Sequence, residues 1–399
     1  MPLFRRDPKE KFVKAVERSL RRLGYSESLT YDEELFAYRL TGDRLIMLGN
    51  IYGHFQSLPQ QEGEQYLGVA LAGLLQEADA PETLDEVRER LIPGIRDRAY
   101  LESARMMAEL GGNPPIPIPH QSLGSTVAAL LILDSPTSMM TVNNEQLASW
   151  DVEFDEALAV ASRNLLSMSR DATWGRIVEG TYASTWNDDY DVSRLLLTEV
   201  VDEVARDLGI AGDPVAFVPH RNLLILTGSA DGAALQAAME LTEQNLNQPS
   251  PVSARPIVRT AGRWEDFVVP DDHPAAPGLE RLMKADLALA HGAIVPIIQQ
   301  VVGDDIFVAG CILGEKDGVV STTTSWSEGA PALIPKTDRI LFFRSQEETW
   351  LVAWDDAEPV IGDLLEPTAY YPTRFRVSAF PTNEQLAAMP KIEGWQDQS

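Results

Sequence analysis

A proline-rich stretch at residues 111–119 limits the fold of this chain more than any other feature. It holds four prolines among nine residues: Pro114, Pro115, Pro117 and Pro119. Proline has no backbone N–H to donate, and it biases the residue before it toward extended geometry. The stretch therefore cannot be helical, and we expect it to separate an N-terminal segment from the rest of the chain.

Residues 1–112 are expected to form a mostly helical segment with one short hairpin. At its start, Asp7 and Pro8 suit the cap and the first turn of a helix. Apolar residues then recur at helical spacing, at Phe12, Val13, Val16, Leu20 and Leu23. Two short apolar runs, at 34–40 and 44–49, suit the hairpin.

Beyond the proline-rich stretch, strand and helix patterns alternate, which indicates a central α/β domain at residues 120–247. Apolar runs predict strands at 127–133, 138–142, 174–182 and 222–227. Helical spacing predicts helices at 154–168, 191–208 and 233–246. A turn-rich segment with two prolines, at 247–251, marks the next boundary.

Residues 252–399 are expected to form a C-terminal domain with a mainly antiparallel sheet and few helices. The pattern predicts a helix at 278–300 and strands at 305–313, 318–326, 339–344, 350–354 and 374–378. Asp317-Gly318 is a strong hairpin turn signal. The fold class expected for the whole chain is therefore α+β (mixed α/β).

The composition indicates a cytoplasmic protein. Cys311 is the only cysteine, so a disulfide framework and a multi-cysteine zinc site are excluded, and its apolar surroundings suggest a buried, inert thiol. The first residues lack the hydrophobic core of a signal peptide. The longest purely apolar stretch, 127–133, is too short to cross a bilayer, so we predict no transmembrane segment.

The charge is large and unevenly distributed. A formal net charge of −27 argues against binding of nucleic acid phosphates. Residues 1–25 hold eight basic and three acidic side chains, so this segment carries +5 and the remainder carries −32. The basic helix at 7–23 has two interpretations: the first helix of a domain with a solvated basic face, or a membrane-surface contact. The first is favoured, because the helix has no aromatic-rich face.

The densest group of polar residues includes Asp188, Asp189, Asp191 and Arg194. A calcium-binding EF-hand is excluded, because the sixth loop position, counted from Asn187, is valine instead of glycine. Asp191 is expected to cap the following helix, with its two acidic neighbours beside the positive end of the helix dipole.

A catalytic interpretation combines this group with a second polar segment. His220 would act as acid or base with one of the carboxylates, and Arg194 or Arg221 would stabilise developing charge. The alternative is purely structural: a capped helix, and a histidine that hydrogen-bonds within a turn. The sequence does not show whether the two segments converge in space.

The sequence lacks the motifs of metal, phosphate-loop and dinucleotide sites. The five histidines are scattered, so no metal site is predicted. The loop at 226–232 joins a strand to a helix but lacks the lysine of a P-loop and the glycine spacing of a dinucleotide site. An ordinary helix cap by Ser229 or Asp231 is expected there. No cofactor is predicted.

Several segments resemble one bacterial family. The residues from Trp186 to Arg194, and those from Val218 through His220-Arg221, look like the central pattern of domain-of-unknown-function family 1444. Further segments that resemble this family lie at 48–52, 305–309, 324–327, 333–338 and 374–377. The family carries no accepted activity, so the resemblance implies no role for any residue. Members of this family have His-Arg-Asp at the positions where this chain has His220, Arg221 and Asn222.

We therefore expect a non-enzymatic protein that recognises another macromolecule, in the first place another protein. No catalytic motif was found, and the acidic surface suits basic partners. Trp186, Tyr190 and Trp326 are the candidate binding residues, although aromatic residues also mark strand ends and turns. The alternative is a hydrolase or small-ligand-binding enzyme that uses the two polar segments; its candidate catalytic residues are Asp188, Asp189, Asp191, Arg194, His220 and Arg221.

Overall fold

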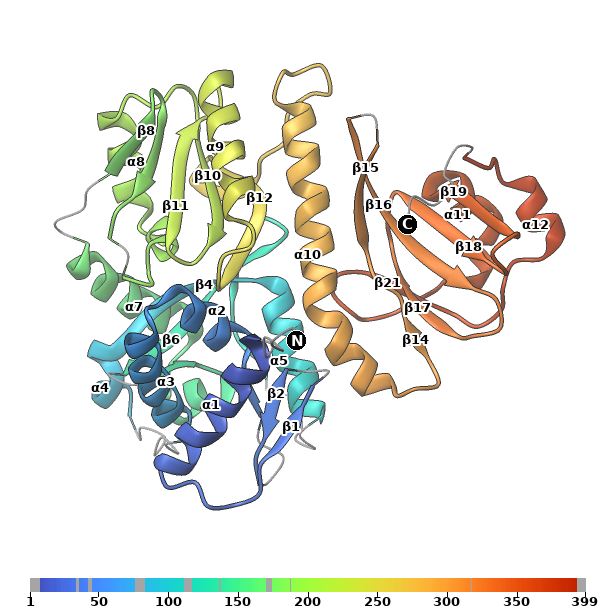
Figure 1. The fold of residues 1–399 in the computed structure, drawn as a ribbon. Helices are drawn as coiled ribbons and strands as arrows, with labels where there is room; N and C mark the ends of the chain where they lie inside the picture. The colour runs from blue at the N-terminus through green and yellow to red at the C-terminus, as the bar shows by residue number, and fades with distance from the viewer. Residues whose placement is uncertain are drawn as a thin grey trace, which may run out of the picture. The chain divides into compact units, whose positions relative to one another are not determined.

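The computed structural model (Figure 1) describes residues 8–33, 36–41, 45–75, 83–110, 117–135, 138–169, 174–186, 188–316 and 318–392. These residues have the mixed α+β fold that the sequence predicts. They form two compact units, each of which is described by itself below. The first joins Met1–Arg96 to Gly111–Phe267, and the second joins Asp97–Leu110 to Val268–Ser399. This division differs from the three segments expected at 1–112, 120–247 and 252–399.

The first unit begins with three helices and a three-stranded antiparallel sheet. They are α1 (Pro8–Arg22), α2 (Gly49–Ser57), α3 (Gln60–Leu75), β1 (Thr30–Asp32), β2 (Ala37–Arg39) and β3 (Leu45–Met47). Phe12, Val16 and Leu20 of α1 are at most 1% exposed, whereas its lysines and arginines are exposed. The face that a membrane-surface helix would insert is therefore buried in the unit. The expected cap, Asp7, lies outside the described residues.

A second sheet of the first unit has the order β4-β6-β5, with β7 paired to β6. Its strands are β4 (Leu91–Asp97), β5 (Gln121–Leu123), β6 (Val127–Ser135) and β7 (Ser138–Thr141), and the helices nearest in sequence are α4 (Leu84–Val87), η1 (Arg88–Arg90), α6 (Asn144–Ser149) and α7 (Phe154–Met168). The strand β4 was not expected in a mostly helical segment. A Cβ on its Gly94 would lie 2.6 Å from Ile132, so β4 needs glycine for its close packing against β6.

The largest sheet is antiparallel and has six strands in the order β13-β12-β10-β11-β9-β8. The strands are β8 (Trp174–Val178), β9 (Thr181–Ser184), β10 (Pro214–His220), β11 (Leu223–Gly228), β12 (Pro251–Thr260) and β13 (Arg263–Asp266). Helices in this part of the chain are η2 (Val192–Leu196), α8 (Thr198–Asp207) and α9 (Gly232–Asn245), of which α9 packs on β10 and β11. The boundary expected at 247–251 lies inside this unit, because β12 pairs with β10. The strand expected at 174–182 is a hairpin of two strands.

The second unit contains two four-stranded sheets, β14-β17-β21-β20 and β15-β16-β18-β19. Its elements are α5 (Arg98–Leu110), α10 (Ala276–Val302), β14 (Phe307–Val308), β15 (Ile312–Lys316), β16 (Val319–Ser327), β17 (Ala332–Pro335), β18 (Arg339–Phe343), β19 (Thr349–Ala353), α11 (Trp354–Ile361), η3 (Gly362–Leu364), β20 (Glu366–Pro367), β21 (Arg374–Val377) and α12 (Asn383–Ala388). The pairs β14–β17 and β16–β18 are parallel, and the others are antiparallel as expected. Asp317, in the turn of the expected hairpin, lies outside the described residues.

The long helix α10 packs against α5 within the second unit. By length and composition alone it is apolar enough to cross a membrane, which the sequence patterns had not predicted. This is weak evidence, because the core helix of a soluble protein passes the same test. In the 18-residue apolar window of this helix, 39% is buried within the protein. The polar residues Asp286 and His291 of the same helix are only 5% and 1% exposed.

Candidate functional site

The two polar segments singled out in the sequence converge at one end of the six-stranded sheet. β9 pairs with β11 so that Ala183 lies opposite Ile225. The segment that follows β9 and the turn that precedes β11 must therefore lie at the same end of these strands. We call the six candidate catalytic side chains gathered there the central cluster: Asp188, Asp189, Asp191, Arg194, His220 and Arg221.

Arg194 forms the most buried contacts of the central cluster. Its Nη1 and Nη2 donate to the two carboxylate oxygens of Asp188, at 3.0 and 2.6 Å. Its Nε donates to the hydroxyl of Ser169 at 2.9 Å. The guanidinium also lies 4.0 Å from the ring centre of Trp186, and the Arg194 side chain is only 2% exposed. A bidentate pair of this kind orients both side chains and leaves Arg194 little freedom to meet a ligand.

The electrostatics of Asp188 follow from this pair. Burial by itself raises the pKa of the Asp188 carboxyl, but the hydrogen bonds and charge of Arg194 outweigh it, together with the backbone N–H of Tyr190 at 3.0 Å. The pKa of Asp188 is therefore held below its usual value. A carboxyl in this state remains ionised and accepts hydrogen bonds, and it does not act as a general acid near neutral pH.

Asp189 connects the two polar segments through hydrogen bonds. Its Oδ1 accepts from Nη2 of Arg221 at 3.1 Å and from Nδ2 of Asn222 at 2.8 Å. Its φ of 68° lies in the left-handed region, which aspartate tolerates better than most residues. The amide of Asn222 donates to Asp189, whereas an aspartate at this position would place a second acceptor there.

Asp191 does not have its expected role. The predicted helix at 191–208 is divided into the 3-10 turn η2 and α8, and the Asp191 side chain makes no capping hydrogen bond. It is fully buried, and its Oδ2 accepts from the backbone N–H of Asp188 at 3.3 Å. The carboxylate therefore stabilises the turn before η2 and not the start of α8.

The His220 ring forms its hydrogen bond in the central cluster with the backbone. Its Nδ1 accepts from the backbone N–H of Asn222 at 3.3 Å, and it makes no hydrogen bond or ion pair with a carboxylate of the described residues. Burial lowers the pKa of His220, and the nearby Asn245 amide and Asp191 carboxylate offset this only in part. The ring is thus neutral near pH 7, and the histidine–carboxylate contact required by the enzyme hypothesis is not formed.

The three candidate binding aromatics differ in exposure. Tyr190 is 3% exposed and Trp326 is 1% exposed, so the expectation that they bind a partner is corrected: both lie inside the protein. Trp186 is half-buried beneath Arg194 and meets Trp174 edge-to-face at 5.7 Å. Within the described residues, no group of three or more His, Cys, Asp or Glu side chains could hold a metal ion.

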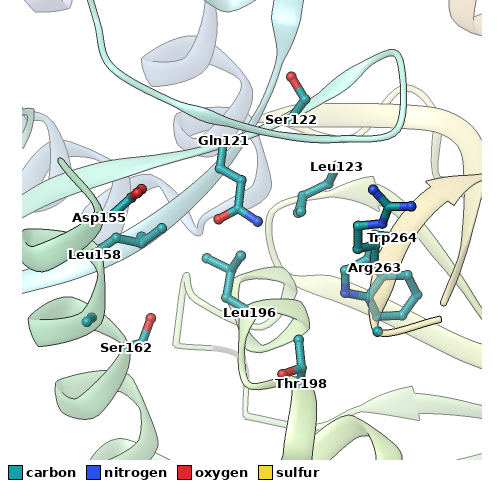
Figure 2. A pocket seen from close by; sticks show the side chains of 12 residues that line it. Gln121, Ser122, Leu123, Asp155, Leu158, Ser162, Leu196, Thr198, Arg263 and Trp264 are labelled. Carbon is teal, nitrogen blue, oxygen red and sulfur yellow. The ribbon is translucent and has the colours of Figure 1, made fainter. Parts of the chain in front are cut away.

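A solvent-open pocket of about 420 Å³ lies elsewhere in the first unit. Figure 2 shows Gln121, Asp155, Ser162, Thr198 and Trp264 around it. The Trp264 indole N–H already donates to the carbonyl of Leu195 at 2.9 Å. No member of the central cluster lines this pocket, so the two features do not form one site.

The loop between β11 and α9 is a helix cap, as the sequence predicts. The Asp231 side chain accepts from the backbone N–H of Ala234 at 3.0 Å. Gly228 in this loop allows close approach of the chain, since a Cβ there would overlap the backbone carbonyl of Ala211. The glycine therefore serves backbone packing and not phosphate binding.

We expect Gly228→Ala to lower the free energy of unfolding by about 2 kcal/mol, because the added methyl group meets backbone that cannot yield easily. Gly232→Ala is the matched control, since nothing lies within 4 Å of a Cβ there; its change should stay under about 1 kcal/mol. Urea unfolding of both variants measures the difference. Equal destabilisation would contradict the packing argument.

Searches against family models, curated proteins and solved structures found no match to this chain. The resemblance to domain-of-unknown-function family 1444 therefore stays a prediction.

The structure also has an exposed apolar surface that the sequence patterns did not indicate. Every residue of β15 is exposed, including Ile312 at 66% and Leu313 at 40%. Val319, at the start of the paired strand β16, is 58% exposed. We call Ile312, Leu313 and Val319 the β15 surface. An apolar run of this kind usually indicates a buried strand, so only the tertiary structure identifies it as a surface.

Proposed function

We propose that this protein recognises another protein by pairing an extended segment of that partner with the free edge of β15. The observation that carries the proposal is the exposure of all five β15 residues at the end of a sheet. In the described part of the chain, β15 pairs on one side only, with β16. The backbone N–H and C=O groups on its other side can pair with an added strand.

The side chains of the β15 surface suit such pairing. Edge strands are usually protected by charged residues or covered by other elements. Here the charged residues Glu315 and Lys316 lie at one end of the strand, with Val319 opposite Lys316, and Ile312 and Leu313 are exposed at the other end. Strand addition gives affinity through backbone hydrogen bonds, and exposed apolar side chains add specificity through contacts with alternate residues of the partner.

Charge indicates the chemistry of the partner. The net charge of −27 creates a negative field around the protein, which accelerates encounter with positively charged segments. The proposed partner segment is therefore extended, with apolar residues at alternate positions and basic residues near them. The central cluster supports this non-enzymatic function indirectly, because Asp188, Asp189, Arg194 and Arg221 are engaged in ion pairs with one another.

A binding comparison tests the proposal. The double variant Ile312→Arg and Val319→Arg removes apolar contacts and repels a basic segment, while each exposed position should change stability by under about 0.5 kcal/mol. We expect it to recover at least tenfold less of a partner that the wild-type protein co-precipitates from native lysate. Backbone amides of β15 should exchange more slowly with solvent when that partner is bound.

The matched control is the double variant Ile177→Arg and Val178→Arg. These residues are 47% and 44% exposed on β8, which is also the last strand of its sheet. The control should recover the partner as wild type does. Equal recovery by the β15 variant, or equal loss by the control, would show that β15 is not the binding edge.

A further inference from the structure

A buried arginine in the second unit has donor groups without partners. Arg374, the first residue of β21, is 0% exposed. Its Nη1 donates to the carbonyl oxygens of Ala309 and Leu333, at 2.8 and 3.2 Å. Its Nε and Nη2 are also buried but have no hydrogen-bond partner. Buried polar groups in folded proteins are almost always hydrogen-bonded, so these two donors require an explanation.

The charge of Arg374 is also unbalanced. No carboxylate of the described residues forms an ion pair or hydrogen bond with it. Burial lowers the pKa of the guanidinium to about 10, against a small opposing influence of Cys311 and Tyr370, so it remains charged near pH 7. Burial of an unpaired charge is strongly unfavourable. A ligand that carries a negative charge would remove this penalty.

His291 supplies a second set of unused polar atoms, on a ring that the charge of Arg374 influences. It lies on α10, is 1% exposed, and both of its ring nitrogens are buried without a partner. Burial, with a further contribution from the charge of Arg374, lowers the pKa of His291 to about 3. The ring is therefore neutral and offers one N–H donor and one acceptor.

Cys311 has the larger of the two electrostatic effects that oppose burial at Arg374, but it does not have the charge of a counter-ion. It precedes β15 and is partly exposed. Burial raises the pKa of the Cys311 thiol to about 12, although the charge of Arg374 lowers it somewhat. A neutral thiol cannot balance the guanidinium, so no described residue supplies the missing charge.

We propose that Arg374 and His291 form a buried binding site for a small oxyanion. The free Nε and Nη2 of the guanidinium form a planar fork that matches two oxygens of a phosphate, a sulfate or a carboxylate. His291 would donate its single N–H to an oxygen of the same anion. Water could satisfy the donors but would leave the charge of Arg374 unbalanced, which is why an anion is inferred. This site is independent of the proposed binding edge.

Thermal unfolding of the full-length protein with added anions tests this site. Inorganic phosphate, sulfate and acetate are added separately to chloride-free buffer, with ionic strength held constant by a bulky sulfonate. We expect one of them to raise the unfolding midpoint of the wild-type protein by roughly 2–4 °C at saturation. A response to phosphate or sulfate would identify a tetrahedral oxyanion, and a response to acetate alone would identify a carboxylate.

Variants show whether the response comes from this site. Arg374→Gln and His291→Phe should abolish or reduce the shift, whereas Arg376→Gln should retain it. Arg376 is the matched control, because it is an exposed arginine two residues away on the same strand. If the wild-type protein and Arg374→Gln respond equally, or if no anion shifts the wild type, the proposal is wrong.

A crystal structure of the wild-type protein decides the question if Arg374→Gln does not fold. Crystals grown with selenate should show anomalous density within hydrogen-bond distance of Arg374 Nε and Nη2. Water alone at these atoms, both in these crystals and in crystals grown with acetate, would overturn the proposal.

Discussion

Asp188→Asn is expected to lower the free energy of unfolding by about 3–5 kcal/mol. Asparagine keeps the shape of aspartate and can still accept from the backbone N–H of Tyr190. It removes the negative charge that faces Arg194, which is only 2% exposed. The destabilisation therefore comes from an unbalanced buried cation. Urea unfolding of the wild-type protein and the variant measures it.

A second substitution separates charge from shape. The double variant Asp188→Asn and Arg194→Met removes both charges, so it should be less destabilised than Asp188→Asn alone. Glu265→Gln is the matched control, because Glu265 pairs with Arg263 at 3.5 Å and both side chains are more than half exposed. That change should stay under about 1 kcal/mol. If Asp188→Asn changes stability no more than this control, the Asp188–Arg194 pair does not stabilise the fold.

Asp97→Asn is expected to become more stable relative to the wild-type protein as the pH rises. Asp97 accepts a hydrogen bond from the backbone N–H of Ala99 at the start of α5. Burial, followed by the negative charge of Asp286, raises the pKa of Asp97 to about 8. Asparagine resembles the protonated side chain, so it can accept the same hydrogen bond without a charge.

The direction of this effect follows from the two pKa values of Asp97. The value in the folded protein lies above that of an unfolded chain, about 3.9, so the folded state binds the proton more tightly between these limits. The stability that protonated Asp97 contributes is complete below about pH 4 and is lost as the pH rises toward 8. The difference between the variant and the wild-type protein should thus grow by about 3 kcal/mol from pH 5 to pH 7.

Unfolding in urea at pH 5, 6 and 7 checks this expectation. Asp363→Asn is the control, because Asp363 is an exposed aspartate of the same unit and its substitution should change stability by under about 0.5 kcal/mol. A constant difference between Asp97→Asn and the wild type over this pH range would show that Asp97 does not hold a proton in the folded protein.

Local patterns predicted much of the fold. The apolar spacing of Phe12, Val16 and Leu20 identified the buried face of α1, and Asp231 caps α9 as expected. These features depend on residues close together in sequence, for which helix periodicity and capping chemistry are sufficient. The same patterns misplaced the boundary at 247–251, because the pairing of β12 with β10 joins strands separated by a whole helix.

The candidate site was predicted only in part. The sequence singled out both polar segments, but their convergence depends on the pairing of β9 with β11. The sequence also did not predict exposure: Tyr190 and Trp326 lie among polar residues and are buried, whereas Ile312 lies in an apolar run and is exposed. Burial is a property of the packed layers around a residue, which its neighbours in sequence do not determine.

The sequence by itself determined that this chain is an acidic α+β protein with one cysteine, a basic first helix and two polar segments near its middle. It did so because composition, charge and periodicity are local quantities. Only the tertiary structure decided that Asp188 pairs with Arg194 and Asp189 with Arg221, that every residue of β15 is exposed, and that the buried Arg374 has no carboxylate partner among the described residues. Each of these depends on contacts between residues distant in the chain, and the chemistry of a site is set by those contacts.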